Sequence, residues 1–152
     1  PIEVNVDPLE LSGFCRDFIS TFDSIAKERR QTLHLLSDIN VEVMADRDKL
    51  TQVMLNLVRN ACEAADIEDT ITLRVGKNDL MGSVSVHNFG DTIPEDKLSI
   101  ITEPFVSCKA NGSGLGLAIV ESLQKSQGGN VSFKSNVNDG TVVDIHLPLV
   151  SL

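Results

Sequence analysis

A glycine-rich stretch in the last third of the chain has the composition of a phosphate-binding loop. Backbone N–H groups are unpaired at a helix amino terminus, and glycine lets a backbone approach a ligand closely. An apolar pattern with helical spacing begins at Leu115 and continues to Leu123. The stretch therefore predicts a phosphate site, although a flexible linker or a tight turn has the same composition. The residues concerned are Lys109, Gly112, Ser113, Gly114 and Gly116.

The spacing of these glycines differs from that of two common phosphate loops. A Walker loop ends in Gly-Lys-Ser or Gly-Lys-Thr, and this stretch does not. Its Gly-x-Gly-x-x-Gly-like fragment has no strand directly before it, which disfavours a Rossmann turn. Other polar positions are therefore needed to identify the ligand.

A second set of polar residues lies along a helix expected to begin after Asp46 and to end near Ala65. Asn56 and Asn60 are four residues apart and share one face, although asparagine is a poor helix former. This stripe either faces solvent or presents amide oxygens and a carboxylate to a polar ligand. Neutral carbonyl oxygens suit a magnesium ion that phosphates already carry. The stripe comprises Gln52, Asn56, Asn60 and Glu63.

A third set follows an apolar strand that is expected to end at His87. Asn88 and Gly90 come next, and this pair of residue types is typical of a turn. A side chain held at a strand end can also recognise the edge of a base. The carbonyl oxygen of Asn88 is able to accept a hydrogen bond from the amino group of adenine.

The composition restricts the class of protein. The chain has 152 residues, enough for one domain, and a formal net charge of −9, which disfavours a nucleic-acid or anionic-membrane partner. Its three cysteines are widely spaced and suggest neither a disulfide framework nor a zinc site. No apolar run approaches the ~18 residues of a membrane span, and no signal peptide opens the sequence. Because the chain starts within an expected strand, we expect an excised domain of a longer protein.

The hydrophobic periodicity predicts the elements that hold these polar sets. Three main helices are expected, over residues 8–29, over 46–65, and from the glycine-rich stretch to about 127, with a short helical turn after Pro94. We therefore expect an α/β (α+β) protein built as a two-layer sandwich, in which helices cover one face of one mixed β-sheet. Strands are expected at residues 2–6, 32–36, 41–44, 70–75, 83–87, 130–135 and 141–147.

In this order, the motifs resemble those of the GHKL ATP-binding superfamily. The closest resemblance is to the catalytic and ATP-binding domain of two-component sensor histidine kinases, and it covers essentially the whole chain. Each motif alone is weak, but four in this order are specific. The similar stretches are 56–61 for the N box, 88–94 for the G1 box, 103–105 for the F box and 112–117 for the G2 box.

This resemblance implies the Bergerat fold, with ATP between the N-box helix and a lid that runs from about Pro94 to Gly112. It implies that Asn60 coordinates Mg²⁺ and that Asn56 holds the assembly of phosphates and metal. Asn88 would bind the adenine amino group, with Gly90 making room beneath the base.

The resemblance also implies the remaining ATP contacts. Phe105 would pack against the lid, and the backbone amides from Gly112 to Leu117 would bind the phosphates. With Asn56, Lys109 is the other catalytic candidate, either reaching the γ-phosphate or remaining a solvated lid lysine. The further expected cofactor-binding residues are Glu63, Ile93, Ser113, Gly114, Leu115 and Gly116.

Three positions depart from the pattern of the superfamily or of its hydrolases. The G1 box usually has aspartate where this chain has Asn88, and glycine where it has Thr92. The amide of Asn88 keeps the acceptor but loses the charge, so weaker adenine binding is expected. The ATPase relatives have a glutamate general base at the position of Asn56, and its absence favours phosphoryl transfer over hydrolysis.

The expected function is therefore that of a protein-histidine kinase domain spanning residues 1–152. It would donate the γ-phosphate of Mg·ATP to a histidine on a helical dimerisation domain located before Pro1. The expected partners are that domain and the receiver domain of a response regulator. We expect a homodimeric parent, a monomeric isolated domain and a cytoplasmic location, also when the parent is membrane-anchored.

Two other readings remain open at this point. A serine-directed, anti-sigma-type kinase of the same superfamily needs no attached acceptor domain. A degenerate nucleotide-sensing or interaction module would bind ATP, or only partners, without transfer. Asn88 favours the degenerate module, whereas both N-box asparagines and all three G2 glycines disfavour it.

Overall fold

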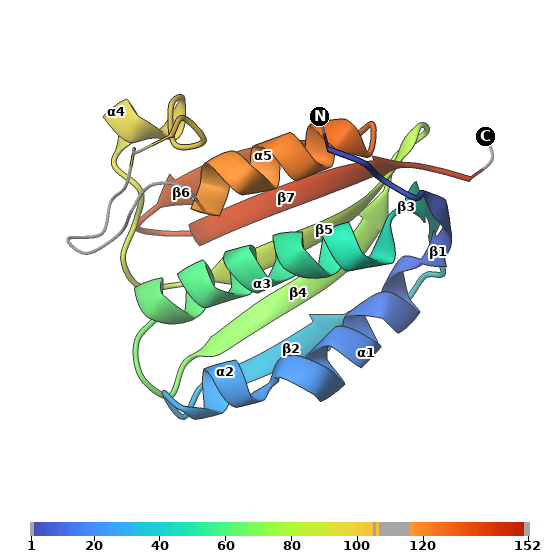
Figure 1. Ribbon diagram of the computed structural model, residues 1–152. Helices are drawn as coiled ribbons and strands as arrows, with labels where there is room; N and C mark the ends of the chain where they lie inside the picture. Colours follow the sequence, from blue (N-terminus) through green and yellow to red (C-terminus); the bar gives the residue numbers. More distant parts are fainter. Residues whose placement is uncertain (1, 105, 107–115, 151–152) are drawn as a thin grey trace.

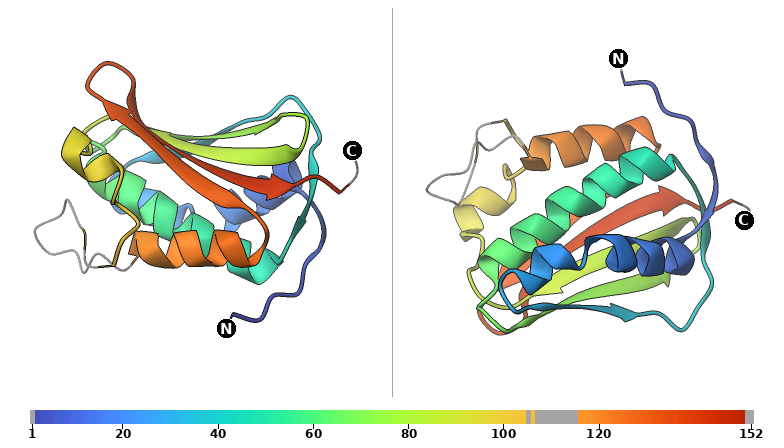
Figure 2. Two further views of the ribbon diagram at one scale, coloured as in Figure 1. Left: turned by 90° about the horizontal axis from the view of Figure 1, so that it is seen from above. Right: turned by 60° about the horizontal axis from the view of Figure 1, so that its bottom comes forward.

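Two layers make up the molecule, a five-stranded sheet and a layer of helices on one of its faces (Figures 1 and 2). The computed structural model describes residues 2–104, 106 and 116–150. The main helices are α1 (Leu11–Phe22), α3 (Arg47–Ala64) and α5 (Gly116–Ser126). The expected two-layer sandwich with three main helices on one face is confirmed.

The five-stranded sheet is mixed, as expected. Its strand order is β2-β4-β5-β7-β6. Only the pair β2 and β4 is parallel, and α3 lies between these two strands in the sequence. The pairs β4–β5 and β6–β7 are antiparallel hairpins. The strands are β2 (Thr32–Leu36), β4 (Thr70–Lys77), β5 (Met81–Asn88), β6 (Asn130–Asn136) and β7 (Gly140–Pro148).

The amino-terminal strand lies elsewhere than predicted. No strand forms over residues 2–6, where Ile2 and Val6 remain 43% and 40% exposed, so their alternation buries no apolar face. Instead β1 (Asp7–Glu10) pairs with β3 (Glu42–Ala45) in a separate two-stranded sheet. A bridge from Val43 to Leu149 connects β3 to the residue that follows β7. The expectation of one sheet was therefore wrong.

The first predicted helix is shorter than expected and interrupted. It begins at Leu11, because the preceding residues belong to β1 and the Glu10 side chain caps α1 by accepting from the Gly13 amide at 2.7 Å. It ends at Phe22, and a second short helix, α2 (Ser24–Lys27), follows. The apolar spacing that predicted one helix continues through both, so periodicity alone does not reveal the break.

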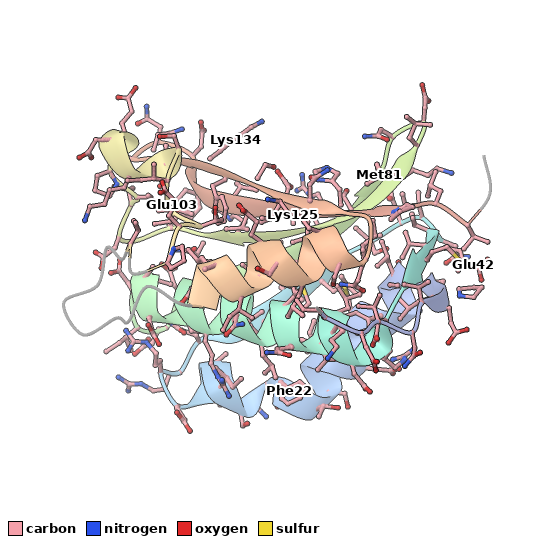
Figure 3. The ribbon with its side chains drawn as sticks, turned by 45° about the horizontal axis from the view of Figure 1, so that its top comes forward. Phe22, Glu42, Met81, Glu103, Lys125 and Lys134 are labelled. Carbon is pink, nitrogen blue, oxygen red and sulfur yellow. The ribbon has the colours of Figure 1, made fainter. Side chains whose placement is uncertain are left out.

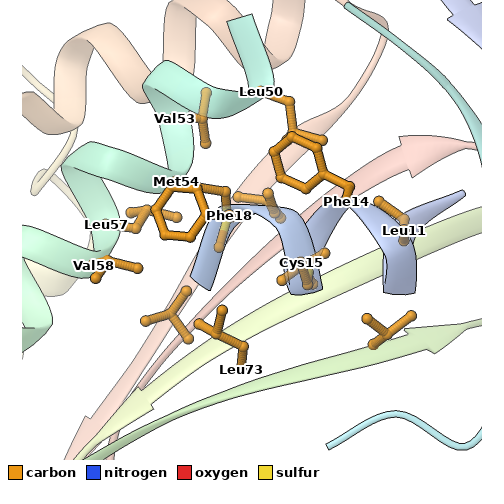
Figure 4. Packing of buried hydrophobic residues seen from close by; sticks show 14 of the residues in the cluster. Leu11, Phe14, Cys15, Phe18, Leu50, Val53, Met54, Leu57, Val58 and Leu73 are labelled. Atoms are coloured by element: carbon orange, nitrogen blue, oxygen red, sulfur yellow. The ribbon is translucent and has the colours of Figure 1, made fainter. Parts of the chain in front are cut away.

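The hydrophobic core lies between the two layers. Side chains of α1 and α3 point toward one another and toward Leu73 of β4 (Figure 4). Burial of each large apolar side chain contributes about 1.5–3 kcal/mol, so this interface is the main support of α3. Burial also raises the pKa of the Cys15 thiol to about 12, which makes it an inert packing residue.

Candidate functional site

Helix α3 is fixed at its start by Asp46. The Asp46 carboxylate accepts hydrogen bonds from the amides of Asp48 (3.0 Å) and Lys49 (3.2 Å), as an N-cap does. It also accepts from the Asn5 amide at 2.8 Å, and the bonds from these three amides, with that from Asn5 the largest contribution, lower the Asp46 pKa. The Asp46 amide donates to Oε1 of Gln127 at 2.8 Å, so the start of α3 is tied to the residue following α5.

A pocket of about 650 Å³ opens at the other end of α3. Its described walls are formed by α3, β5, residues 91–101, Val106, the start of α5 and the strands β6 and β7. This volume lies within the ~300–1,000 Å³ that is usual for small-molecule sites. In Figure 1, this end of α3 and α4 (Glu95–Leu98) lie on the same side of the molecule, and Lys97 of α4 lines the pocket.

The polar stripe of α3 meets this pocket in part. Asn60 and Glu63 line it together with the apolar Leu57. Asn56 is not among the lining residues, but its Oδ1 lies 3.9 Å from the position of an added Cβ at Gly116. Since Gly116 is the first residue of α5, the N-box helix and the end of the glycine-rich stretch are neighbours.

Asn88 stands on the opposite wall and is only 3% exposed. Its Nδ2 donates to the Phe89 carbonyl oxygen at 2.8 Å, so Oδ1 is the atom left to accept a hydrogen bond. Thr141 of β7 pairs with Asn88 across the sheet and lines the same pocket. The predicted residue at the strand end therefore presents an amide to the pocket.

A chain of hydroxyl groups positions Ile93, another expected site residue. The Thr141 and Ser135 hydroxyls are 2.6 Å apart, and Ser135 Oγ accepts from the Ile93 amide at 2.9 Å. Ile93 and the following Pro94 line the pocket. The residues that resemble the G1 box are thus anchored to the β6–β7 hairpin.

Gly90 brings the segment after β5 against the end of α3. Its φ is +114°, which favours glycine, and an added Cβ would lie 2.1 Å from the Ala64 carbonyl oxygen. The next amide, of Asp91, donates to the same oxygen at 2.8 Å. The close approach at Gly90 thus serves the packing of two backbone segments, and its expected place beneath a base remains a prediction.

The segment that continues through α4 closes a further side of the pocket. Lys97, Ile101 and Val106 line it. The Thr102 hydroxyl donates to the Glu121 carboxylate of α5, and this hydrogen bond, with help from Lys125 at 3.1 Å, lowers the Glu121 pKa. The expected site residues that lie outside the described residues are Phe105, Lys109, Gly112, Ser113, Gly114 and Leu115.

The pocket combines an apolar lining with polar groups on two sides. Gly116 and Leu117 place the amino-terminal end of the 11-residue helix α5 at its wall, where anionic groups are favoured. In the described part of the chain, no three His, Cys, Asp or Glu side chains gather to hold a metal ion. Phosphate oxygens of a bound molecule are suitable further ligands for a cation beside Asn60. The arrangement suits a ligand with a flat apolar part and an anionic part.

The structure adds lining residues that the sequence reasoning did not select. Asp91 and Thr92 directly follow Gly90, a predicted site residue, and this proximity in the sequence is the signal that could have identified them. Thr141 and Phe133 reach the pocket through the pairing of β5, β7 and β6. That pairing is tertiary, and no local pattern of the sequence indicates it. Among the described residues, no helix is long and apolar enough to cross a membrane.

Comparisons with known proteins agree with this geometry. Residues 45–151 match the family described as histidine kinase-, DNA gyrase B-, and HSP90-like ATPase. The sensor histidine kinase ZraS of Salmonella typhi is 30% identical over 153 residues, which covers 99% of this chain and 33% of that protein. The chain therefore spans about a third of the length of this curated relative.

Two solved structures resemble the whole fold. The catalytic domain of histidine kinase ThkA, in a nucleotide-free form, gives a TM-score of 0.85 at 28% identity, covering 96% of this chain and 97% of that one. Full-length ShkA in complex with AMPPNP gives a TM-score of 0.85 at 25% identity, covering 99% of this chain and 32% of that one. ThkA has also been solved in complex with the response regulator protein TrrA.

Proposed function

We propose that this chain, which belongs to the family of histidine kinase-, DNA gyrase B- and HSP90-like ATPases, binds Mg·ATP and donates the γ-phosphate to a histidine of a sensor-kinase dimerisation domain. The observation that carries the proposal is the shared pocket of Asn60, Asn88 and the start of α5. Its polar groups stand on opposite walls, as a nucleotide with a base and a phosphate chain requires. The AMPPNP complex of the similar ShkA supports the same ligand class.

The base would lie against β5 and β7. Asn88 Oδ1 accepts from the amino group of adenine, while the hydrogen bond from Nδ2 to Phe89 keeps the amide in that orientation. Thr141, next to Asn88 across the sheet, supplies a second polar group at the same wall. Val86 and Val143 provide apolar surface for the ring.

The phosphates would lie between α3 and the start of α5. The backbone amides at Gly116 and Leu117 and the positive end of the α5 dipole stabilise their charge. Asn60 offers an amide oxygen that fits a magnesium ion, and Asn56 lies beside Gly116 to orient the phosphate end. When bound, Mg·ATP supplies the phosphoryl group and neutralises charge on its oxygens.

Position 56 favours transfer rather than hydrolysis. An amide cannot remove a proton from water, so Asn56 is unable to act as a general base. The protein then contributes binding, orientation and charge stabilisation, which carry most of the catalysis in phosphoryl transfer. The proposed partners follow from this role: a histidine-bearing dimerisation domain of a homodimeric parent, and a receiver domain of a response regulator.

Substitution of Asn60 tests the proposed nucleotide site. We expect Asn60→Ala to lower the Mg²⁺-dependent affinity for ATP about tenfold or more, the factor that corresponds to one lost charge-assisted contact. The matched control is Gln52→Ala, which removes an exposed amide from the same helix away from the pocket. Calorimetric titration with and without Mg²⁺ measures both affinities.

Thermal unfolding of the nucleotide-free variants completes this experiment. The midpoint of Asn60→Ala should remain close to that of the wild type, because the substitution removes a ligand-facing group. Unchanged ATP affinity in this variant, or loss of folding with full affinity in the folded fraction, would contradict the assigned role.

A further inference from the structure

The face of the five-stranded sheet that no helix covers differs in charge from the rest of the molecule. Side chains alternate along each strand, so residues that flank the pocket residues point to the opposite face. This face carries two cations, Arg74 and Lys134, and one carboxylate, Asp144. Since the whole chain has 22 acidic and 13 basic residues, this face is unusually poor in acidic groups.

All three histidines of the chain also lie on the strand positions of this face. His34, His87 and His146 belong to β2, β5 and β7. Figure 3 shows Met81 and Lys134, which share the face, on the side of the sheet turned away from α5. The surface is therefore a separate chemical environment from the nucleotide pocket.

A groove of about 330 Å³ crosses four strands of this face. Strand pairing places Leu36 opposite Arg74 and Arg74 opposite Ser85, and in the next row Thr72 opposite His87 and His87 opposite Val142. The volume is at the lower end of the ~300–1,000 Å³ range of small-molecule sites. The lining residues are Leu36, Thr72, Arg74, Ser85, His87 and Val142.

Arg74 is the central group of the groove. Within the described part of the chain, its guanidinium forms no hydrogen bond or ion pair, so its five donors are free for a ligand. A planar guanidinium binds carboxylate or phosphate through two parallel hydrogen bonds. The Thr72 hydroxyl lies two residues along the same strand and adds a further donor.

The other polar groups orient an anion toward Arg74. Ser85 donates its hydroxyl proton to the Asp144 carboxylate, and this carboxylate repels an anion from the β7 side. His87 donates through Nε2 to the Asp139 carbonyl oxygen at 2.7 Å, because that oxygen can only accept. The Leu36 side chain borders the Arg74 end with an apolar surface, so an apolar part of a ligand can pack there.

We propose that this groove is a second ligand site, which binds a small organic oxyanion, a carboxylate or phosphate monoester with a short apolar part. Arg74 binds the oxyanion through its guanidinium, Thr72 donates to it, and Leu36 and Val142 contact the apolar part. Along β5, Asn88 lines the nucleotide pocket and its neighbour His87 lines the groove. Along β7, Thr141 and Val143 line the pocket, and Val142 between them lines the groove. Because neighbouring residues of a strand point to opposite faces, the two sites lie on opposite faces of one sheet.

Titration of the isotope-labelled chain with two probes tests the proposal. Butyrate and inorganic phosphate are added separately at constant ionic strength, while NMR spectra follow the backbone amides and the Arg74 Nε–H. We expect saturable shifts at Thr72, Arg74, Ser85 and His87 with at least one probe. The probe that binds more tightly identifies carboxylate or phosphate as the preferred group.

Three variants separate a built site from general attraction of anions. Arg74→Gln should weaken binding about tenfold, Arg74→Lys should weaken it less, and Lys134→Gln, a cation on the same face outside the groove, should leave it unchanged. Both positions, Arg74 and Lys134, are exposed, and circular dichroism verifies that the three variants fold. Equal weakening by Lys134→Gln, shifts confined to the nucleotide pocket, or no saturable shift with either probe would overturn the proposal.

Discussion

Asn88 is a neutral amide at a position where the resemblance predicts an aspartate. Its Nδ2 donates one proton to the Phe89 carbonyl oxygen, and this bond orients the amide, whose acceptor is Oδ1. A base with an exocyclic amino group fits the remaining oxygen, whereas a base carbonyl at the same place would face an acceptor. In the proposed function, Asn88 would therefore recognise adenine through the orientation of its amide instead of through charge.

Substitutions at position 88 measure this recognition. We expect Asn88→Leu to weaken ATP binding by about 1–3 kcal/mol, because the adenine amino group loses its buried acceptor. Asn88→Asp should keep or tighten binding, since it retains an acceptor and adds charge. The control is Asn130→Leu, an exposed position on β6 outside the pocket. Calorimetry on the folded variants decides, and unchanged affinity in Asn88→Leu would return Asn88 to a role in the turn.

Sequence reasoning identified residues within the motifs of this site better than residues that other strands add to it. Asn60, Glu63, Asn88 and Ile93 were selected from motifs, and they line the pocket. Thr141 was not selected, because it reaches Asn88 only through the pairing of β5 with β7. Local spacing contains no information on which strands pair, so residues that tertiary pairing adds to a site escape such reasoning.

At the scale of elements, long hydrophobic patterns predicted the helices and hairpins well, whereas a short pattern at the start of the chain predicted a strand that does not form there. Helices α3 and α5 and both hairpins were expected within a few residues, since each combines a long apolar pattern with capping or turn residues. The alternation at residues 2–6 was too short to distinguish a strand from an extended segment. The separate pairing of β1 with β3 depends on contacts between segments about 35 residues apart, which no local signal predicts.

The capping of α3 by Asp46 gives a pH-dependent prediction. The Asp46 pKa is lowered in the folded protein, so its stabilisation is full above the ordinary value of about 3.9 and is lost as the pH falls through the folded-state pKa. Asp46→Ala should therefore destabilise the protein by about 0.5–2 kcal/mol at pH 7. This cost should shrink on acidification below about pH 4.

Urea denaturation of the wild type and of Asp46→Ala at pH 7 and pH 3 measures the loss in free energy of unfolding at each pH. Glu3→Ala is the control, since Glu3 is an exposed carboxylate close to Asn5 in the sequence. An Asp46→Ala cost that is the same at both pH values would show that the ionised carboxylate contributes nothing beyond the neutral group.

At the scale of the whole molecule, the positions of the three histidines bear on where the proposed phosphoryl acceptor lies. His34, His87 and His146 lie on strands of the uncovered face, opposite the face that holds the pocket. In-line transfer requires the acceptor nitrogen close to the γ-phosphate, and a strand held in the sheet cannot swing through to the other side. In the proposed function, the acceptor histidine would then come from another domain.

Incubation with γ-labelled ATP and Mg²⁺ tests this separation. The chain alone should remain unlabelled and release little phosphate, whereas an added dimerisation domain from its parent protein should become labelled on histidine. The variant Asn60→Ala serves as the control that removes nucleotide binding from the donor. Stoichiometric acid-labile label on this chain alone would exclude the proposed division of roles.

Strand β3 connects a segment near the start of the described chain with a segment near its end. On one side it pairs with β1 near the start of the chain, and on the other Val43 bridges to Leu149 while the Val150 amide donates to the Glu42 carbonyl oxygen at 3.1 Å. Tension applied between Asn5 and Val150 would therefore load β3 as well as β7, from which Leu149 and Val150 continue. Because β3 runs directly into Asp46, the N-cap of α3, the same pull would also reach the start of the helix that carries Asn60.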